Sequence, residues 1–188
     1  MLRIRTARLE LLAAPADVTC REAAGAEDWY APLDVEKPEA WPPPFNDEAS
    51  QSWFARRIAR EGAESGWLLW YVVRRPATDT DRRVLIGNGG FTGAPDARGS
   101  VEIGYSLLPS WQGQGYGTEL TAALVSWAFS HEHVQRVLAV TYPVLLASIR
   151  VLEKNGFQHS CRGADGRSVV FELRRGVFER RGGASGGR

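Results

Sequence analysis

A run of alternating glycines is the pattern in this sequence that most directly suggests chemistry. It reads Gln112-Gly113-Gln114-Gly115-Tyr116-Gly117 and is followed by Thr118. Glycine leaves the backbone bare, and the first amides of a helix have no partner inside the helix, so such a loop can bind a phosphate group. A tight surface turn would use the same residues, and a short glycine motif does not separate the two alternatives.

Two common phosphate-binding loops fit this run poorly. A P-loop has lysine and then serine or threonine after its last glycine, whereas Gly117 is followed by Thr118 and Glu119. A dinucleotide-binding fingerprint needs its third glycine one residue later and an acidic residue near the end of the next strand. That strand ends Val140-Thr141-Tyr142. The spacing therefore excludes the first loop and disfavours the second.

The hydrophobic pattern places the glycine run between a strand and an amphipathic helix. Residues 100–108 are typical of a strand that stops at Pro109, and apolar residues recur at helical spacing over 118–130. A proline- and aromatic-rich loop is predicted over 37–45. Further strands are predicted at 4–12, 67–74, 84–91, 136–141, from 157 and at 169–173, and further helices at 16–31, 46–61 and 143–155.

Several ordered blocks of the sequence resemble the GNAT superfamily of N-acetyltransferases. Gln112, Gly115 and Gly117 match its pattern of arginine or glutamine, two residues, glycine, one residue, and glycine or alanine. The segments 101–105 and 147–157 resemble the ribosomal-protein alanine N-acetyltransferases, the Rim-type branch of that superfamily. The opening Arg5-Thr6-Ala7-Arg8-Leu9-Glu10-Leu11 resembles the same branch.

This resemblance implies a single α/β (α+β) domain whose mixed, mostly antiparallel sheet is flanked by helices. Two neighbouring strands, which correspond to 100–108 and 136–141, would splay apart to admit acetyl-CoA. The loop amides would take the diphosphate of the coenzyme, and main-chain groups of Leu107 and Leu108 would face its pantetheine arm or stabilise an oxyanion. The implied coenzyme-binding residues are Leu107, Leu108, Gln112, Gly113, Gln114, Gly115, Tyr116, Gly117 and Thr118.

The resemblance also implies catalytic candidates, and two positions depart from the family pattern. Glu102 would accept a proton from the attacking ammonium, directly or through water, although an ordinary strand glutamate is the alternative. Leu145 replaces an asparagine that is usual in the family, and Leu152 replaces a tyrosine acid. Ser148 is the remaining candidate acid, and a helix cap is its alternative role.

We therefore expect an N-acetyltransferase that moves acetyl from acetyl-CoA to a primary amine. A protein N-terminal α-amine is the favoured acceptor, because its pKa of roughly 7.7 to 8.0 demands less of a base than the pKa of about 10.4 of lysine. Small-molecule amines, such as a polyamine or an antibiotic, follow closely. Leu145 and Leu152 motivate the alternative of a CoA-binding module without turnover. Trp29, Tyr30, Trp41 and Phe45 lie in the region that corresponds to the acceptor side, where core packing is the expected role of each.

Composition narrows the setting of this activity. The chain has 188 residues, with 23 basic against 22 acidic side chains, so we expect no general nucleic-acid-binding surface. It has no apolar run that could span a membrane and no secretory signal, and its two cysteines are too few for a disulfide framework, which predicts a cytoplasmic protein.

No metal is expected either, because His131-Glu132-His133 and His159-Ser160-Cys161 lack the usual ligand spacing. We predict one domain over 1–178, followed by a flexible tail at 179–188. The sequence leaves a homodimer open.

Overall fold

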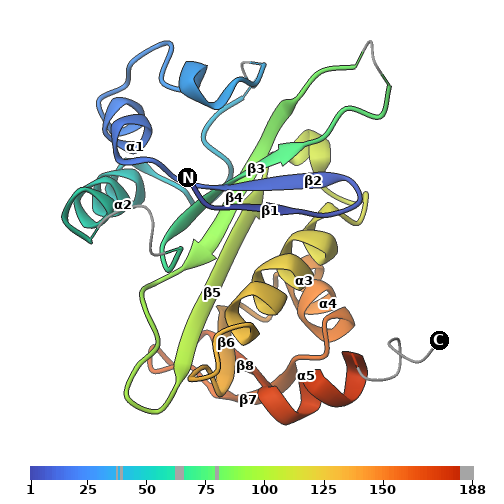
Figure 1. Ribbon diagram of the computed structural model, residues 1–188. Coiled ribbons are helices and arrows are strands. Elements are labelled where there is room, and N and C mark those ends of the chain that lie inside the picture. Colours follow the sequence, from blue (N-terminus) through green and yellow to red (C-terminus); the bar gives the residue numbers. More distant parts are fainter. Residues whose placement is uncertain (37, 39, 62–65, 79–80, 183–188) are drawn as a thin grey trace. The chain divides into compact units, whose positions relative to one another are not determined.

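The computed structural model describes all residues except 37, 39, 62–65, 79–80 and 183–188 (Figure 1). Its eight strands follow the sheet order β1-β2-β3-β4-β5-β6-β8-β7, in which β5 and β6 are parallel and the other registered pairs are antiparallel. This is the mostly antiparallel mixed sheet that the sequence predicted. None of the described helices is long and apolar enough to cross a membrane.

The described residues group into two compact units. Met1–Gly90 and Tyr105–Leu120 form the first, and Phe91–Gly104 and Thr121–Arg188 form the second. The chain therefore changes unit within β4, β5 and α3. The predicted single domain over 1–178 stays a prediction.

The first unit begins with a hairpin of two short strands. β1 (Arg3–Arg5) and β2 (Leu9–Ala13) pair with each other, and β2 then pairs with β3 (Leu69–Arg74). The prediction of one strand over 4–12 is therefore wrong. Thr6 closes the turn, because its backbone N–H donates to the carbonyl of Leu9 at 3.0 Å and its hydroxyl oxygen accepts the backbone N–H of Leu9 at 3.0 Å.

β3 pairs with β4 (Val84–Phe91), whose bounds agree with the prediction. Two helices pack beside one another next to these strands, α1 (Ala16–Ala23) and α2 (Glu48–Glu61) (Figure 1). The predicted helix over 16–31 is shorter than expected, and a 3-10 turn at Ala31–Leu33 follows it. Asp47 caps α2, since its Oδ1 accepts the backbone N–H of Ser50 at 2.9 Å.

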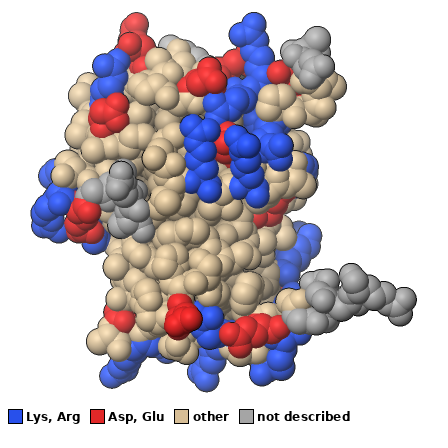
Figure 2. Space-filling model, viewed as in Figure 1, with Lys and Arg blue, Asp and Glu red and all other residues tan. Residues whose placement is uncertain are grey.

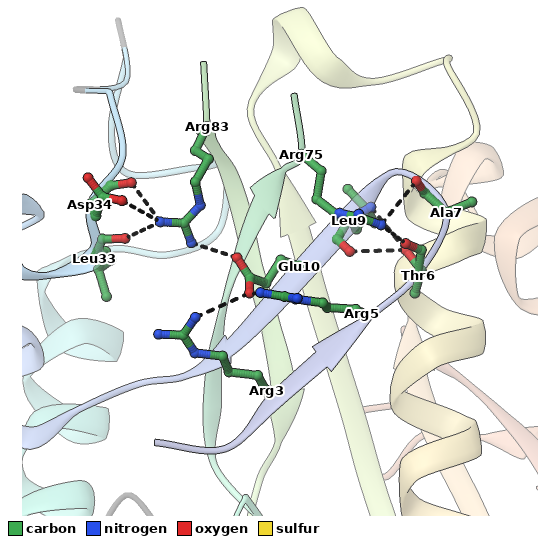
Figure 3. A network of polar contacts seen from close by, with 10 residues as sticks. All are labelled: Arg3, Arg5, Thr6, Ala7, Leu9, Glu10, Leu33, Asp34, Arg75 and Arg83. Atoms are coloured by element: carbon green, nitrogen blue, oxygen red, sulfur yellow. Dashed lines mark hydrogen bonds and ion pairs between the residues drawn. The ribbon is translucent and has the colours of Figure 1, made fainter. Parts of the chain in front are cut away.

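A buried carboxylate organises the arginines on this hairpin. The side chain of Glu10 is only 4% exposed, and it accepts hydrogen bonds from Arg5 at 3.1 Å and Arg83 at 2.6 Å, with Arg3 at 3.4 Å (Figure 3). Burial opposes ionisation of Glu10, but these bonds outweigh it and hold the pKa of the carboxyl below its usual value. Figure 2 shows the resulting group of basic side chains over the β1–β2 hairpin.

The second unit contains the parallel pair and the C-terminal part of the chain. β5 (Ser100–Leu107) follows its predicted range closely, and β6 (Arg136–Thr141) keeps its predicted bounds. β6 pairs with β8 (Val169–Arg174), which pairs in turn with β7 (Gln158–Arg162). The helices are the later part of α3 (Tyr116–Phe129), α4 (Leu146–Lys154) and α5 (Arg175–Gly182).

The pairing of β5 with β6 covers only part of both strands. It runs from Ser100 opposite Arg136 to Ile103 opposite Ala139, whereas β5 continues to Leu107 and β6 to Thr141. The register of the parallel pair therefore ends before the C-terminal end of either strand, and the predicted splay of the two strands stays a prediction.

At the C-terminus the last described helix reaches into the segment 179–188, whose expected flexibility stays a prediction. α5 is helical through Gly182 and so includes the first four residues of the segment 179–188. The rest of that segment lies outside the described residues.

Candidate active site

The glycine run forms a loop that turns directly into α3. A 3-10 turn at Pro109–Trp111 precedes it, and Gly113 and Gly115 follow with φ of +75° and +83°. These backbone angles lie in the left-handed region, which residues with a Cβ adopt only with strain. A Cβ on Gly113 would meet nothing within 4 Å. Bare glycine backbone that leads directly into the N-terminus of α3 suits a diphosphate, because the positive end of the helix dipole favours an anion there, so the residues present fit the coenzyme.

Side chains of the loop fold back onto their own neighbours. The Nε2 group of Gln112 donates to the carbonyl of Leu107 at 2.9 Å, and that of Gln114 donates to the carbonyl of Ser110 at 2.9 Å. These bonds hold the loop in shape and leave its glycine backbone uncovered by its own side chains.

A turn near the N-terminus anchors this loop through Glu119, in the first turn of α3. The carboxylate of Glu119 accepts the hydroxyl of Thr6 at 2.6 Å, the backbone N–H of Arg8 at 2.8 Å and the Nε of Arg8 at 2.7 Å. Burial opposes ionisation of Glu119, yet these bonds hold the pKa of its carboxyl below the usual value. The ionised carboxylate of Glu119 therefore joins α3 to the turn at Thr6 and Arg8 through three hydrogen bonds.

Arg8 also touches the glycine loop itself. Its Nη1 donates to the carbonyl of Gln114 at 3.0 Å, and its guanidinium lies 4.3 Å from the ring centre of Tyr116. A Cβ on Gly115 would lie 3.4 Å from its Nη2. The loop thus carries a cation at its edge, which favours an anionic ligand.

Arg75 supports the same turn from the end of β3. Its Nη1 donates to the carbonyls of Thr6 and Ala7, at 2.6 and 3.5 Å (Figure 3). The backbone N–H of Arg75 donates to the carbonyl of Arg8 at 2.8 Å. The sequence reasoning missed all of these residues as contributors to the site. The only signal was the resemblance of the opening segment, which carried no assigned role.

The main-chain groups of Leu107 and Leu108 are more fully engaged than expected. The carbonyl of Leu107 accepts the side chain of Gln112, and the backbone N–H of Leu108 donates to the carbonyl of Ile86 at 2.9 Å. An oxyanion could take the amide of Leu108 only in exchange for that existing bond. The coenzyme contacts of these two residues stay a prediction.

Glu102 lies in the paired part of β5, opposite Leu138 of β6. Its backbone carbonyl accepts the N–H of Thr92 at 3.1 Å, and its side chain is half-buried. Burial raises the pKa of the Glu102 carboxyl. A carboxylate with a raised pKa is a stronger base, so this group is better suited to accept a proton than a fully solvated glutamate.

Ser148, the other catalytic candidate, lies in α4, as does Leu152, and Leu145 immediately precedes the helix. Ser148 is half-buried within the first turn, and Leu145 occupies the cap position and supplies no capping side chain. Ser148 is therefore not the N-cap residue of α4. Leu152 is 1% exposed and packs in the core, where a polar acid would need a buried partner. The structure does not test the catalytic role of Ser148.

The aromatic residues of the expected acceptor region divide into two kinds. Trp29, Trp41 and Tyr71 form a cluster with ring centres 5.1 to 6.3 Å apart, which confirms core packing for the first two. Phe45 does not pack in the core, because it is 83% exposed and has a φ of +64°. Pro44, the residue before Phe45, is held in place, because its carbonyl accepts the hydroxyl of Ser106 at 2.7 Å.

A buried acid lies beneath the aromatic cluster. Glu22 accepts hydrogen bonds from the hydroxyl of Tyr71 and, at 2.7 Å, from the Nε1 of Trp41. Burial raises the pKa of Glu22, and the two bonds offset only part of that effect.

Comparison with known proteins identifies the family to which these features belong. The acetyltransferase (GNAT) domain model matches residues 9–158. The chain belongs to the GNAT acetyltransferase family. It is 30% identical over 173 residues to the Bacillus subtilis protein YjdG, described as an uncharacterized N-acetyltransferase, and the match covers 91% of this chain and 98% of YjdG.

Solved GNAT structures share the fold at low sequence identity. The ribosomal L7/L12 α-N-protein acetyltransferase RimL, in complex with coenzyme A, superposes with a TM-score of 0.65 at 17% identity, covering 92% of this chain and 98% of RimL. The ribosomal-protein-S5-alanine acetyltransferase of Vibrio fischeri gives 0.64 at 14% identity, covering 93% and 97%. The aminoglycoside acetyltransferase AAC(6')-Ib, also with coenzyme A, gives 0.57 at 19% identity, covering 92% and 98%.

Membership of the GNAT family makes this chain an acyl-CoA-dependent N-acetyltransferase. Acetyl-CoA is the acetyl donor of this fold, and an amine is the acceptor. Among the described residues, no group of three or more histidine, cysteine and acidic side chains is placed to hold a metal ion.

Proposed function

We propose that this GNAT enzyme acetylates the N-terminal α-amine of a protein or peptide in the cytoplasm and belongs to the Rim-type branch. The observation that carries the proposal is Glu102, a half-buried carboxylate on β5 whose pKa burial raises. The pKa of an α-amine is about 7.7 to 8.0, far closer to such a base than the value of about 10.4 for lysine. Two of the structural neighbours named above act on ribosomal proteins, according to their descriptions.

In this mechanism Glu102 accepts a proton from the bound ammonium, so that the neutral amine can attack the acetyl carbonyl. The nitrogen of the neutral amine bonds to the acetyl carbon as the carbon–sulfur bond of the thioester breaks, and the sulfur leaves as a thiolate. The nitrogen then loses a second proton, which ends on that thiolate and gives the free thiol of the coenzyme. The glycine loop and α3 amides hold the diphosphate. Leaving as a thiolate is favourable because a thiol pKa of about 8.5 lies near neutral pH, so a strong acid in the place of Leu152 is not required.

Phe45 supports an acceptor with an extended chain. Phe45 is a large apolar side chain that is exposed at a strained backbone angle. Such strain costs stability and is found mainly at functional positions. Phe45 lies in the segment between α1 and α2, and the hydroxyl of Ser106 holds the carbonyl of the preceding residue, Pro44. We assign it to contact the first side chains of the acceptor peptide.

An amine panel tests the proposal directly. Release of coenzyme thiol is measured with free N-terminal peptides, with N-terminally blocked lysine peptides, with polyamines and with aminoglycosides. We expect the highest kcat/KM for free N-terminal peptides. A higher value for polyamines or aminoglycosides would replace the proposed acceptor, and CoA binding without turnover on any amine would support a regulatory module instead.

A further inference from the structure

Four arginines line a cavity in the second unit, and none of the candidate catalytic or coenzyme-binding residues is among its lining residues. The cavity has a volume of about 510 Å³ and is lined by Arg98, Gln135, Arg136, Arg174, Arg175 and Gly176. These residues come from the loop before β5, the start of β6, the end of β8 and the start of α5. Among the residues that the structure describes, no acidic side chain lines it.

Two of the four guanidinium groups are held in place by neutral partners. Arg175 donates from Nε to the carbonyl of Val134 at 2.8 Å and from Nη2 to the carbonyl of His131 at 2.7 Å. Arg136 donates from Nε to the hydroxyl of Ser100 at 2.7 Å. Such bonds fix the direction of a guanidinium without cancelling its charge, so the cavity is organised in advance for an anion.

The nearby carboxylates do not fully neutralise this charge. Glu172 lies 2.9 Å from Arg174 and 4.0 Å from Arg136, and Glu179 lies 3.5 Å from Arg175. Both are outside the lining.

The third acid near the cavity, Asp96, uses its Oδ1 for the backbone N–H groups of Arg98 and Ser100, at 2.8 and 2.9 Å. Within the described part of the chain, no hydrogen bond or ion pair engages the guanidinium of Arg98. The cavity therefore has more donors than acceptors around it.

The first turn of α5 adds backbone donors at the same place. Arg175 begins the helix and gives its own N–H to the carbonyl of Gln135 at 2.9 Å, and Gly176 lines the cavity. The amides that follow in the first turn have no partner within the helix, and the positive end of the helix dipole favours negative charge.

From these contacts we infer that the cavity is a second anion site, which binds the phosphate group of a phosphorylated small molecule. Guanidinium forks match the oxygen geometry of phosphate, and pockets for small ligands commonly measure roughly 300 to 1,000 Å³. The cavity lining lies within the second unit and includes none of the expected coenzyme-binding residues. The proposed site therefore does not depend on which amine the enzyme acetylates.

Equilibrium dialysis with two probes, inorganic pyrophosphate and adenosine monophosphate, tests this site. The protein is first saturated with coenzyme A at low ionic strength, so that the glycine loop is filled. We expect one further mole of probe bound per chain, and a loss of at least tenfold in affinity in the double variant Arg98→Gln/Arg174→Gln. Both side chains are exposed, so the variant should keep its Tm.

The matched control is Arg57→Gln/Arg60→Gln on α2, which removes the same charge elsewhere. This control variant should still bind the additional mole of probe per chain with unchanged affinity. Absence of a second mole in the wild-type protein would overturn the proposal, and so would an equal loss in both double variants, since that would mean a general charge effect.

Discussion

Arg8 and Glu119 join the opening of the chain to the first turn of the helix that follows the glycine loop. Two atoms of Arg8, its backbone nitrogen and Nε, lie 2.8 and 2.7 Å from the two carboxylate oxygens of Glu119. The same arginine holds the carbonyl of Gln114 within the loop. A residue outside the recognised coenzyme motif therefore sets the position of that motif.

Substitution of Arg8 should weaken coenzyme binding without unfolding the protein. Arg8→Ala removes the side-chain hydrogen bonds of Arg8 to the carboxylate of Glu119 and to the carbonyl of Gln114. A hydrogen bond that involves a charged group contributes about 1.5 to 3 kcal/mol. We expect the Kd of coenzyme A, measured by titration calorimetry, to rise roughly tenfold. Arg5→Ala is the control, because Arg5 lies on the same hairpin but bonds to Glu10. Equal losses in the two variants would contradict a specific role for Arg8.

Gly115 should tolerate neither a side chain nor a negative charge. Its φ of +83° imposes strain of about 1 to 2 kcal/mol on any other residue. An aspartate would also repel the diphosphate. Gly115→Asp should abolish the rise in Tm that coenzyme A produces, and Gly115→Ala should reduce it.

Gly25→Ala supplies the strain-matched control for this pair. Gly25 has a φ of +71° and open space around its Cβ position, and it lies at the end of α1. It should lower the Tm of the free protein yet keep the full effect of coenzyme A. If Gly115→Asp kept that effect as well, the diphosphate would have to bind elsewhere.

Glu102→Gln tests the base. Glutamine keeps the shape of the side chain but cannot accept a proton, so kcat should fall roughly 10²- to 10⁴-fold while the Kd of the coenzyme stays constant. Because burial raises the pKa of Glu102, the wild-type kcat/KM should increase as pH rises through that pKa, and the variant should lack this limb. The deficit should shrink towards the amine pKa, where the acceptor arrives neutral. A small, pH-independent loss would make Glu102 a structural residue.

Glu22 should make the protein less stable as the pH rises. Its folded pKa is raised, so the neutral form stabilises the fold below the unfolded pKa of 4.5 and that contribution is lost as pH rises towards the folded pKa. In that window the free energy of unfolding of the wild-type protein should fall relative to Glu22→Gln, by up to about 1.4 kcal/mol per pH unit. Urea unfolding of both proteins from pH 4 to 8 measures the difference. Parallel curves would show that Glu22 ionises normally.

Phe45→Gly separates strain from acceptor binding. Glycine adopts the φ of +64° freely, so we expect a gain of about 1 kcal/mol in stability together with a several-fold higher KM for the acceptor peptide. Asp34→Gly, at a φ of +53°, is the control for a similar angle, and it also removes the exposed ion pair of Asp34 with Arg83, so we expect a smaller gain in stability and an unchanged KM. An unchanged KM in Phe45→Gly would remove Phe45 from the acceptor site.

The sequence predicts the strands around the site better than it predicts the contacts that hold the loop. β4 and β6 have the predicted bounds because their apolar runs are short and end at polar residues. The β1–β2 turn was missed because Thr6-Ala7-Arg8 lacks the glycine, proline or asparagine that marks most turns. The Arg8–Glu119 pair spans 111 positions, and single-sequence periodicity carries no information on such pairs.

The sequence also could not predict which individual polar side chains are buried. Glu102 and Glu22 are both glutamates in ordinary-looking segments, yet tertiary packing raises the pKa of each. Phe45 shows the reverse, since an apolar residue expected in the core lies exposed. Local pattern fixes the face on which a residue lies only where the element is regular, and Phe45 lies in an irregular loop.

The junction between Thr6, Arg8 and Glu119 also has a consequence for the order in which the chain matures. During synthesis the β1–β2 hairpin is made more than a hundred residues before its partner Glu119. Closing so distant a pair costs chain entropy and slows folding. The glycine loop thus acquires its shape late in synthesis. A nascent chain that ends before Glu119 cannot yet bind acetyl-CoA.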